Sequence, residues 1–296
     1  MSDNEIQLFR TALAQVAVDV EAVMETLLPT PESQVIEAMR YAALAGGKRM
    51  RAFLVMESCS VYRVPEKQAA RLAAAVEFMH TYSLIHDDLP SMDNDDVRRG
   101  KPTVHVKWDE ATAVLAGDAL QTLAFETLTA PQSAPDPNTR LRLIKSLAQA
   151  VGAMGMVGGQ GFDIAAERHG AILGIEDITE LQSLKTGQLF RWSAEVGPVV
   201  ANLDTSAMSE YARALGLAFQ VWDDVLDIEG DPAKAGKRLR KDAVAGKATF
   251  VALLGLAGAK NHAAGLVDAA IAALDRFGSP AENLRRAARF SINREA

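Results

Sequence analysis

The sequence predicts an all-α protein, a single-domain bundle of long helices that takes in residues 1–296. Apolar and alanine-rich stretches recur at spacings of three and four residues, the period of an amphipathic helix, and strand-like alternation is hard to find. Glycine, proline and small polar residues separate these stretches and leave helices of about 11 to 25 residues. The breaks lie at residues 29–31, 65, 90, 100–102, 131–138, 230–232 and 278–280.

Three segments predict individual elements. Thr30, Pro31 and Glu32 indicate a helix that begins at the proline, with the threonine before it as the cap. The proline-rich segment 131–137 is short and flanked by similar helical composition, so we expect an interhelix loop there and not a domain boundary. Residues 211–227 predict a helix with one apolar stripe, made of Tyr211, Leu215, Phe219, Trp222 and Leu226.

Composition excludes several classes of protein. Hydrophobic residues make up 49% of the 296 residues and charged residues 23%, which is typical of a globular chain. The net charge of -7 and the lack of a basic stripe argue against a nucleic-acid partner. The single cysteine, Cys59, rules out an internal disulfide framework. Charges interrupt every apolar run and the first residues are acidic, so we expect no stable membrane insertion, no signal peptide and a cytoplasmic protein.

The segment 83–96 carries the sharpest chemical signal, a run of aspartates at the end of a predicted helix. One face of that helix would bury Phe78, Tyr82, Ile85 and Leu89, and another would carry Glu77, His80, Asp87 and Asp88. Pro90 disrupts the helix, so Asp93 comes from the turn just past its end. Carboxylates at a helix C-terminus repel one another and the helix dipole, and a hard divalent cation relieves that repulsion. A solvated acidic loop is the simpler interpretation of one such run.

A second acidic segment, 220–227, changes that balance. Asp223 and Asp227 lie one turn apart on a predicted helix, with Asp224 between them, and the apolar stripe places this helix in the core. Aspartates are rarely buried unless they are paired or bind a metal. Because both segments carry an Asp-Asp pair followed by a third aspartate, a metal site is favoured over two acidic surface faces.

Magnesium fits these clusters better than calcium. A calcium loop beginning at Asp93 would need glycine at its sixth position and glutamate at its twelfth, but Arg98 and Val104 stand there. Mg²⁺ held by few carboxylates completes its shell with water and phosphate oxygens. Several cations suited to phosphate contact lie near the motifs, although each taken alone is more typical of a solvated surface. Lys48 and Arg51 follow Gly46-Gly47 and are expected three apart on one helical face. The others are Arg98, Arg99, Lys185, Lys237 and Lys247.

Other chemistries lack their motifs. No Gly-Lys pair is followed by serine or threonine, residues 158–161 lack dinucleotide spacing, and no Gly-x-Ser-x-Gly elbow exists. Cys59 follows the apolar pattern of its neighbours and is expected as a core thiol. His86 is expected either as a titrating or ligating group or as a packed side chain.

The motifs together resemble those of the short-chain trans-prenyl diphosphate synthases, most closely the bacterial farnesyl diphosphate synthases. The matching segments follow in order at residues 46–51, 80–100, 102–105, 115–120, 158–160, 185–187, 220–227 and 246–249. The resemblance implies the isoprenoid synthase type of all-α fold, with helices around a central cavity, and a homodimer. It also implies condensation of isopentenyl diphosphate with an allylic diphosphate, first dimethylallyl and then geranyl, to farnesyl diphosphate and pyrophosphate.

The resemblance assigns roles residue by residue. Both acidic motifs would bind three Mg²⁺ ions, with Mn²⁺ as a substitute, through Asp87, Asp88, Asp93, Asp223, Asp224 and Asp227. Isopentenyl diphosphate would meet Lys48, Arg51, His80 and Arg99. The allylic diphosphate would meet Arg98, Lys185, Lys237 and Lys247, and the developing carbocation would lie beside Thr186 and Gln220.

Product length depends on the depth of the apolar cavity. Tyr82, next to Ser83, lies five residues before Asp87, roughly 7.5 Å along a helix axis, so its ring is expected to close the floor of the pocket. The spacing between Asp88 and Asp93 looks like the bacterial type but does not separate farnesyl from geranylgeranyl synthases. The alternatives are a geranylgeranyl or geranyl diphosphate synthase, a class I terpene cyclase or head-to-head prenyl synthase, a non-catalytic synthase subunit, and a calcium-binding scaffold.

Overall fold

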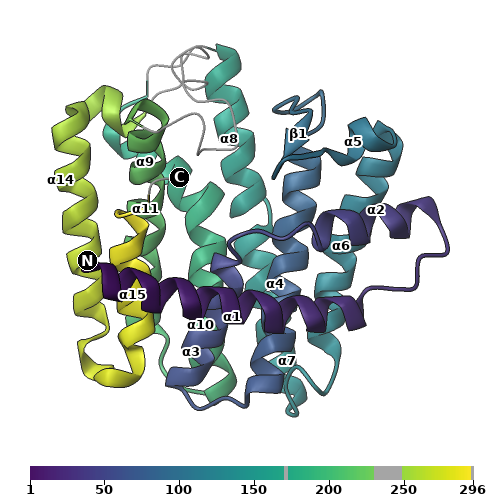
Figure 1. Cartoon of the computed structure of the whole chain (residues 1–296), viewed down its shortest axis with the longest axis horizontal. Coiled ribbons are helices and arrows are strands. Elements are labelled where there is room, and N and C mark those ends of the chain that lie inside the picture. The colour runs from purple at the N-terminus through teal and green to yellow at the C-terminus, as the bar shows by residue number, and fades with distance from the viewer. Residues whose placement is uncertain (170–172, 230–248, 295–296) are drawn as a thin grey trace.

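Helices form nearly all of the structure, which confirms the all-α prediction (Figure 1). The computed structural model describes residues 1–169, 173–229 and 249–294. Its longer α-helices are α1 (Asp3–Leu27), α2 (Gln34–Ala43), α3 (Met50–Val61), α4 (Glu66–Asp87), α6 (Glu110–Thr129), α7 (Pro137–Val151), α8 (Met156–His169), α9 (Ile175–Gln182), α10 (Gln188–Ala201), α11 (Ser206–Glu229), α14 (Phe250–Ala273) and α15 (Glu282–Ser291). The short elements are α5 (Val104–Lys107), the π-helical turn η1 (Ser183–Gly187) and the 3₁₀ turns η2 (Asp275–Phe277) and η3 (Ser279–Ala281).

A small antiparallel hairpin, which the sequence did not indicate, follows α4. It pairs β1 (Val97–Arg98) with β2 (Lys101–Pro102). The chain reverses at Arg99 and Gly100, whose φ angles are 54° and 73°. Strands of two residues are too short to show alternation, so no periodicity could predict them.

Local capping decides where several helices begin. The second helix does not begin at Pro31, as expected, but at Gln34, because Ser33 is the N-cap and its hydroxyl accepts from the Ile36 amide. The expected interhelix loop at 131–137 is confirmed. It ends where the Asp136 carboxylate caps α7, with Pro137 in the first turn of that helix.

The helix α4 lies at the centre of the bundle and is packed by α1, α3 and α6 (Figure 1). Its middle is buried, and Ala73, Ala74 and Ala75 are fully inaccessible, so short side chains let the neighbouring helices approach closely. The predicted apolar face is also confirmed: Phe78, Tyr82, Ile85 and Leu89 are all buried. The last turn of α4 therefore has a fixed position in the core.

The helix α14 packs along α11 and, with α9, buries a second apolar cluster that includes Val221, Val225 and Phe250. The region Phe250–Phe277 contains an 18-residue apolar window with a mean hydropathy of 1.3, and it is long enough to cross a membrane by length and composition alone. The expectation that no apolar run reaches membrane-spanning length does not hold for this helix by length and composition, although Lys260 and Asp268 do interrupt it. Only 28% of this apolar window is buried in the structure.

Candidate active site

The first aspartate cluster lies where α4 ends. Asp87 is the last residue of the helix, and the chain then folds back so that the Asp93 amide donates to the Asp87 carbonyl oxygen at 2.8 Å. The pKa of Asp87 is raised to about 6, chiefly by burial; the charges of Asp93 and Asp88 contribute to the rise, and Lys185 and Arg98 oppose it. The turn thus gathers carboxylates whose charge the neighbouring cations do not fully compensate.

Asp88 is bound by Arg98 of the hairpin. Its side chain is buried, and the Arg98 guanidinium meets it with an Nη2–Oδ1 distance of 2.6 Å and an Nε–Oδ1 distance of 2.8 Å. Burial raises the pKa of Asp88, and the hydrogen bond and charge of Arg98 lower it. The hairpin therefore holds the predicted phosphate ligand Arg98 against the acidic cluster.

The second cluster lies on α11, which confirms that Asp223 and Asp227 share a helix one turn apart. Each of its carboxylates is half-buried. Asp223 Oδ1 pairs with Arg294 Nη2 at 3.0 Å, and Asp224 Oδ2 accepts from the Phe250 amide at 2.7 Å. Asp227 is also engaged. The cluster is partnered on the protein side before any ligand binds.

The two halves of the predicted site lie within electrostatic reach of each other. The pKa of Arg51 on α3 is lowered to about 10, chiefly by burial; Glu77 and Asp223 oppose the shift, and Arg99 contributes to it. Lys185 of η1 likewise acts on Asp87. Arg51 of α3 thus lies near enough to Asp223 of α11 for their charges to interact, as Lys185 of η1 does to Asp87 of α4.

A cationic group lies beside the acidic one. Arg51 Nη1 lies 3.3 Å from His80 Nε2, and the guanidinium carbon of Arg51 lies 5.0 Å from the centroid of the Phe190 ring. Burial lowers the pKa of His80 well below its ordinary value, and four arginines lower it further: Arg51, Arg99, Arg98 and Arg49. His80 is thus neutral at pH 7 in a field of excess positive charge, the environment that an anion would stabilise.

The loop before α3 brings Arg99 and Lys48 to this group. Arg99 donates to the Gly46 carbonyl oxygen, and its guanidinium carbon would lie 2.6 Å from a Cβ at Gly47, whose φ is 126°. Only glycine fits there. The expectation that Lys48 and Arg51 share a helical face is wrong, because α3 begins at Met50 and Lys48 lies exposed in the loop.

Lys185 and Thr186 stand on the π-helical turn between α9 and α10. Lys185 Nζ pairs with Asp163 Oδ2 of α8 at 2.5 Å, and Thr186 is buried. A Cβ at Gly159 of α8 would lie 2.3 Å from the Lys185 amide nitrogen, so the two helices touch backbone to backbone. Departures of this kind from α-helical geometry are frequent at functional sites.

Gln220 and the proposed chain-length residues complete the predicted set. Gln220 donates to Gln182 Oε1 at 2.8 Å. Tyr82 is 5% exposed, and its ring packs edge-on against the His86 imidazole with centroids 5.7 Å apart. Ser83 donates to the His80 carbonyl oxygen at 2.9 Å. Lys237 and Lys247 lie outside the described residues.

His86 and Glu77 both have packing partners. A Cβ at Gly117 of α6 would lie 2.1 Å from His86 Nε2, so the imidazole is packed, the second of its two expected roles. Glu77 was expected on the acidic face of α4, but it is buried and pairs with Arg49 Nη1 at 3.0 Å. Burial raises the pKa of the Cys59 thiol to about 12, which confirms a core cysteine.

Sequence reasoning missed two charged partners, Asp163 and Arg294. The glycine pair at 158–159 signals a close helix approach, which points to the helix that carries Asp163. Nothing in the local sequence signals Arg294, which reaches Asp223 from far along the chain.

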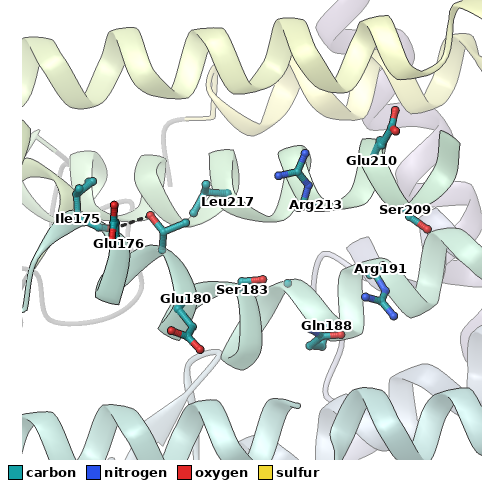
Figure 2. A pocket seen from close by; sticks show the side chains of 12 residues that line it. Ile175, Glu176, Glu180, Ser183, Gln188, Arg191, Ser209, Glu210, Arg213 and Leu217 are labelled. Atoms are coloured by element: carbon teal, nitrogen blue, oxygen red, sulfur yellow. Dashed lines mark hydrogen bonds between the residues drawn. The ribbon is translucent and has the colours of Figure 1, made fainter. Parts of the chain in front are cut away.

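A separate groove of about 650 Å³ runs between α9–α10 and α11 (Figure 2). Its lining includes Glu180, Arg191, Glu210, Arg213 and Leu217, and none of the predicted site residues lines it. Within residues 1–169, 173–229 and 249–294, no three acidic, histidine or cysteine side chains already surround one point as a metal site would require. Asp87, Asp88 and Asp93 of the first cluster lie close enough to interact, but within the described part of the chain they do not form a finished metal cage.

Comparison with known proteins agrees with this geometry. The family model described as polyprenyl synthetase matches residues 32–281. The chain belongs to the polyprenyl synthetase family. It is similar to the farnesyl diphosphate synthase of Escherichia coli K12, with 46% identity over 81% of this chain and 82% of that protein. It also resembles the apo structure of an FPP/GFPP synthase from Zymomonas mobilis, with a TM-score of 0.88, 47% identity and coverage of 96% of this chain and 98% of that one. A chloroplastic geranylgeranyl pyrophosphate synthase of Arabidopsis thaliana is 41% identical over 86% of this chain and 72% of its own length.

Proposed function

We propose that this protein is a head-to-tail prenyltransferase that condenses isopentenyl diphosphate with dimethylallyl and then geranyl diphosphate, giving farnesyl diphosphate and pyrophosphate. Its similarity to farnesyl diphosphate synthases over most of the chain supports this reaction. The observation that carries the proposal is the opposition of charge at the site. Neutral His80 lies among arginines, and the negative charge of Asp223 raises the pKa of Arg51.

The cationic side of the site suits isopentenyl diphosphate. Arg51 and Arg99 offer guanidinium groups to its diphosphate, His80 offers a neutral imidazole beside them, and the exposed Lys48 adds a point charge from the loop. A diphosphate anion would form ion pairs with these cations and so relieve the repulsion between their positive charges. Its binding is therefore expected to bring Lys48 toward the arginines.

The acidic side suits Mg²⁺. The donors are hard carboxylate oxygens, and the raised pKa of Asp87 reflects burial together with negative charge from Asp93 and Asp88. A preassembled cage is not needed, since Mg²⁺ takes several oxygens from water and substrate phosphates. When bound, Mg²⁺ neutralises the diphosphate and makes it a leaving group. We assign it to six ligands, with Mn²⁺ as a substitute and three ions per site: Asp87, Asp88, Asp93, Asp223, Asp224 and Asp227.

The remaining residues act on the allylic substrate. Lys185 and Arg98 meet its diphosphate, together with Lys237 and Lys247, and stabilise the charge that develops as the C1–oxygen bond breaks. Thr186 and Gln220 lie beside the allylic cation. The alkene of isopentenyl diphosphate attacks C1, and the proton lost from its C2 passes to the departing pyrophosphate. The buried apolar face of α4 keeps water from the cation.

The floor of the pocket limits the product. Tyr82 is buried five residues before Asp87 on α4, with Ser83 beside it, so a prenyl chain that grows along this helix meets the phenol ring. A geranylgeranyl product is the second candidate, because geranylgeranyl pyrophosphate synthases are also similar to this chain.

We further propose a homodimer formed through α5 and α6. Val106, Val114 and Leu115 are 48%, 40% and 53% exposed there, and large apolar side chains exposed on neighbouring elements are typical of an interface. Substitution of both Val114 and Leu115 by aspartate is expected to give monomers in analytical ultracentrifugation.

Chromatography of the products tests the function. Isopentenyl and dimethylallyl diphosphate with Mg²⁺ are expected to give farnesyl diphosphate. A longer main product would favour the geranylgeranyl alternative. A cyclase would convert geranyl diphosphate without isopentenyl diphosphate, and a non-catalytic subunit or calcium scaffold would give no turnover; these results would overturn the proposal.

A further inference from the structure

The residue that pairs with Asp223 comes from the segment after α15, far from both acidic motifs in sequence. Arg294 Nη2 lies 3.0 Å from Asp223 Oδ1, and the Arg294 side chain is 5% exposed, against 35% for that of Asp223. Burying a guanidinium costs desolvation free energy, and an ion pair at the protein surface does not require that cost. The contact therefore calls for a role beyond surface electrostatics.

Other contacts fix Arg294 independently of Asp223. Its Nη2 donates to the Phe219 carbonyl oxygen at 2.8 Å, its Nε donates to the Ser291 carbonyl oxygen at 3.0 Å, and its guanidinium lies 3.6 Å from the centroid of the Phe219 ring. Its own carbonyl oxygen accepts from Trp222 Nε1 at 3.3 Å. The guanidinium is thus held in place before it donates to the Asp223 carboxylate.

We propose that Arg294 is a positioning residue for Asp223, holding Oδ1 in place so that Oδ2 is set to receive a divalent cation. This inference rests on the proposed function, since it takes Asp223 as a metal ligand. Hydrogen bonds from outside the ligand set orient carboxylate ligands, and loss of such a partner typically costs 10- to 100-fold in metal affinity.

Two features favour a positioning role over competition with the metal. The ion pair of Arg294 with Asp223 is made at Oδ1. In addition, its contacts with Phe219 and Ser291 hold the guanidinium when Asp223 turns to a cation, so the arginine does not need to leave. Without Arg294, the Asp223 side chain would have to lose its rotamer freedom on metal binding, and the affinity would fall.

The test measures metal binding directly. The full-length protein is titrated with Mn²⁺ in the presence of inorganic pyrophosphate, free Mn²⁺ is followed by electron paramagnetic resonance, and thermal unfolding is recorded for each variant. Arg294→Met is expected to weaken Mn²⁺ binding by about 10- to 100-fold. Arg294→Lys keeps a cation in place and is expected to lose about threefold.

Arg285→Met is the matched control. Arg285 of α15 is buried, donates to the carbonyl oxygens of Leu274 and Gly278, and has Glu282 as its carboxylate partner. It is expected to lower the unfolding temperature and leave Mn²⁺ affinity within about twofold.

Each outcome of the titration supports or refutes the positioning role of Arg294. If Arg294→Met binds Mn²⁺ as the wild type does, or if Arg285→Met weakens binding equally, the positioning role is refuted while the proposed function stands. If Arg294→Met does not fold, Arg294→Lys decides, and unchanged affinity refutes the role. If the wild type binds no Mn²⁺ with pyrophosphate, the proposed function fails and the inference fails with it.

Discussion

Gly159 offers a sharp test of how the bundle holds the catalytic turn. A Cβ at this position would lie 2.3 Å from the amide nitrogen of Lys185 and 2.7 Å from its Cα. These are backbone atoms, so they cannot rotate away, and ordinary contact near 3.4 Å requires α8 and η1 to separate by roughly 1 Å. Gly159→Ala is therefore expected to cost about 1–3 kcal/mol of overpacking.

Gly161 in the same helix is the matched control, because nothing lies within 4 Å of its would-be Cβ. Gly161→Ala is expected to raise the free energy of unfolding by about 0.5–1 kcal/mol through helix propensity alone. Since both substitutions gain the propensity term, the difference between them isolates the clash at about 1–3 kcal/mol.

Urea denaturation of both variants measures the difference, and steady-state kinetics measures its effect on the site. A shift of Lys185 and Thr186 of roughly 1 Å is expected to lower kcat by about 100-fold in Gly159→Ala, with Gly161→Ala close to wild type. Equal stabilities for the two alanine variants would refute the reasoning, because the close approach of α8 to η1 would then carry no energetic cost.

Three other predictions follow from burial at single residues. Tyr82→Ala is expected to lengthen the main product and Tyr82→Phe to leave it unchanged, as seen by chromatography; an unchanged farnesyl product in the alanine variant would refute the stopper role. Burial raises the pKa of Asp87 to about 6, so its ionised form destabilises the metal-free fold above that pH, and the cost disappears as pH falls toward 3.8. Asp87→Asn is thus expected to be more stable than wild type at pH 7 but not near pH 4, and parallel curves in urea denaturation would contradict this. The Cys59 thiol, with a pKa of about 12, is expected to resist iodoacetamide in the native protein and to react in denaturant; equal rates would show that it is not buried.

Much of the fold follows from local patterns. The helical period and the glycine and proline breaks predicted α4, α11 and the loop before α7, and these are confirmed. The helix start at Pro31 was wrong because Thr30 and Ser33 are both of a capping type, and it is Ser33 that caps α2. Which of two neighbouring capping residues begins a helix depends on packing, and a short stretch of sequence does not contain that information.

The site divides in the same way. The aspartates were evident because both motifs are contiguous, and so was the helical spacing of Asp223 and Asp227. The partners that hold them were not evident, because Arg294 and Asp163 come from distant segments. Lys48 was misplaced because a left-handed Arg49 at the cap delays the start of α3. Local chemistry was thus predictable, whereas pairings across helices required the fold.

The proposed reaction requires two acidic clusters that share one substrate. A crystal structure of the protein with Mg²⁺ and a non-hydrolysable thio-analogue of dimethylallyl diphosphate tests this directly. We expect the diphosphate to lie between Asp87 and Asp223, with metal ions bridging it to both. A diphosphate held by one cluster alone, or bound in the groove between α9–α10 and α11, would contradict the proposed reaction.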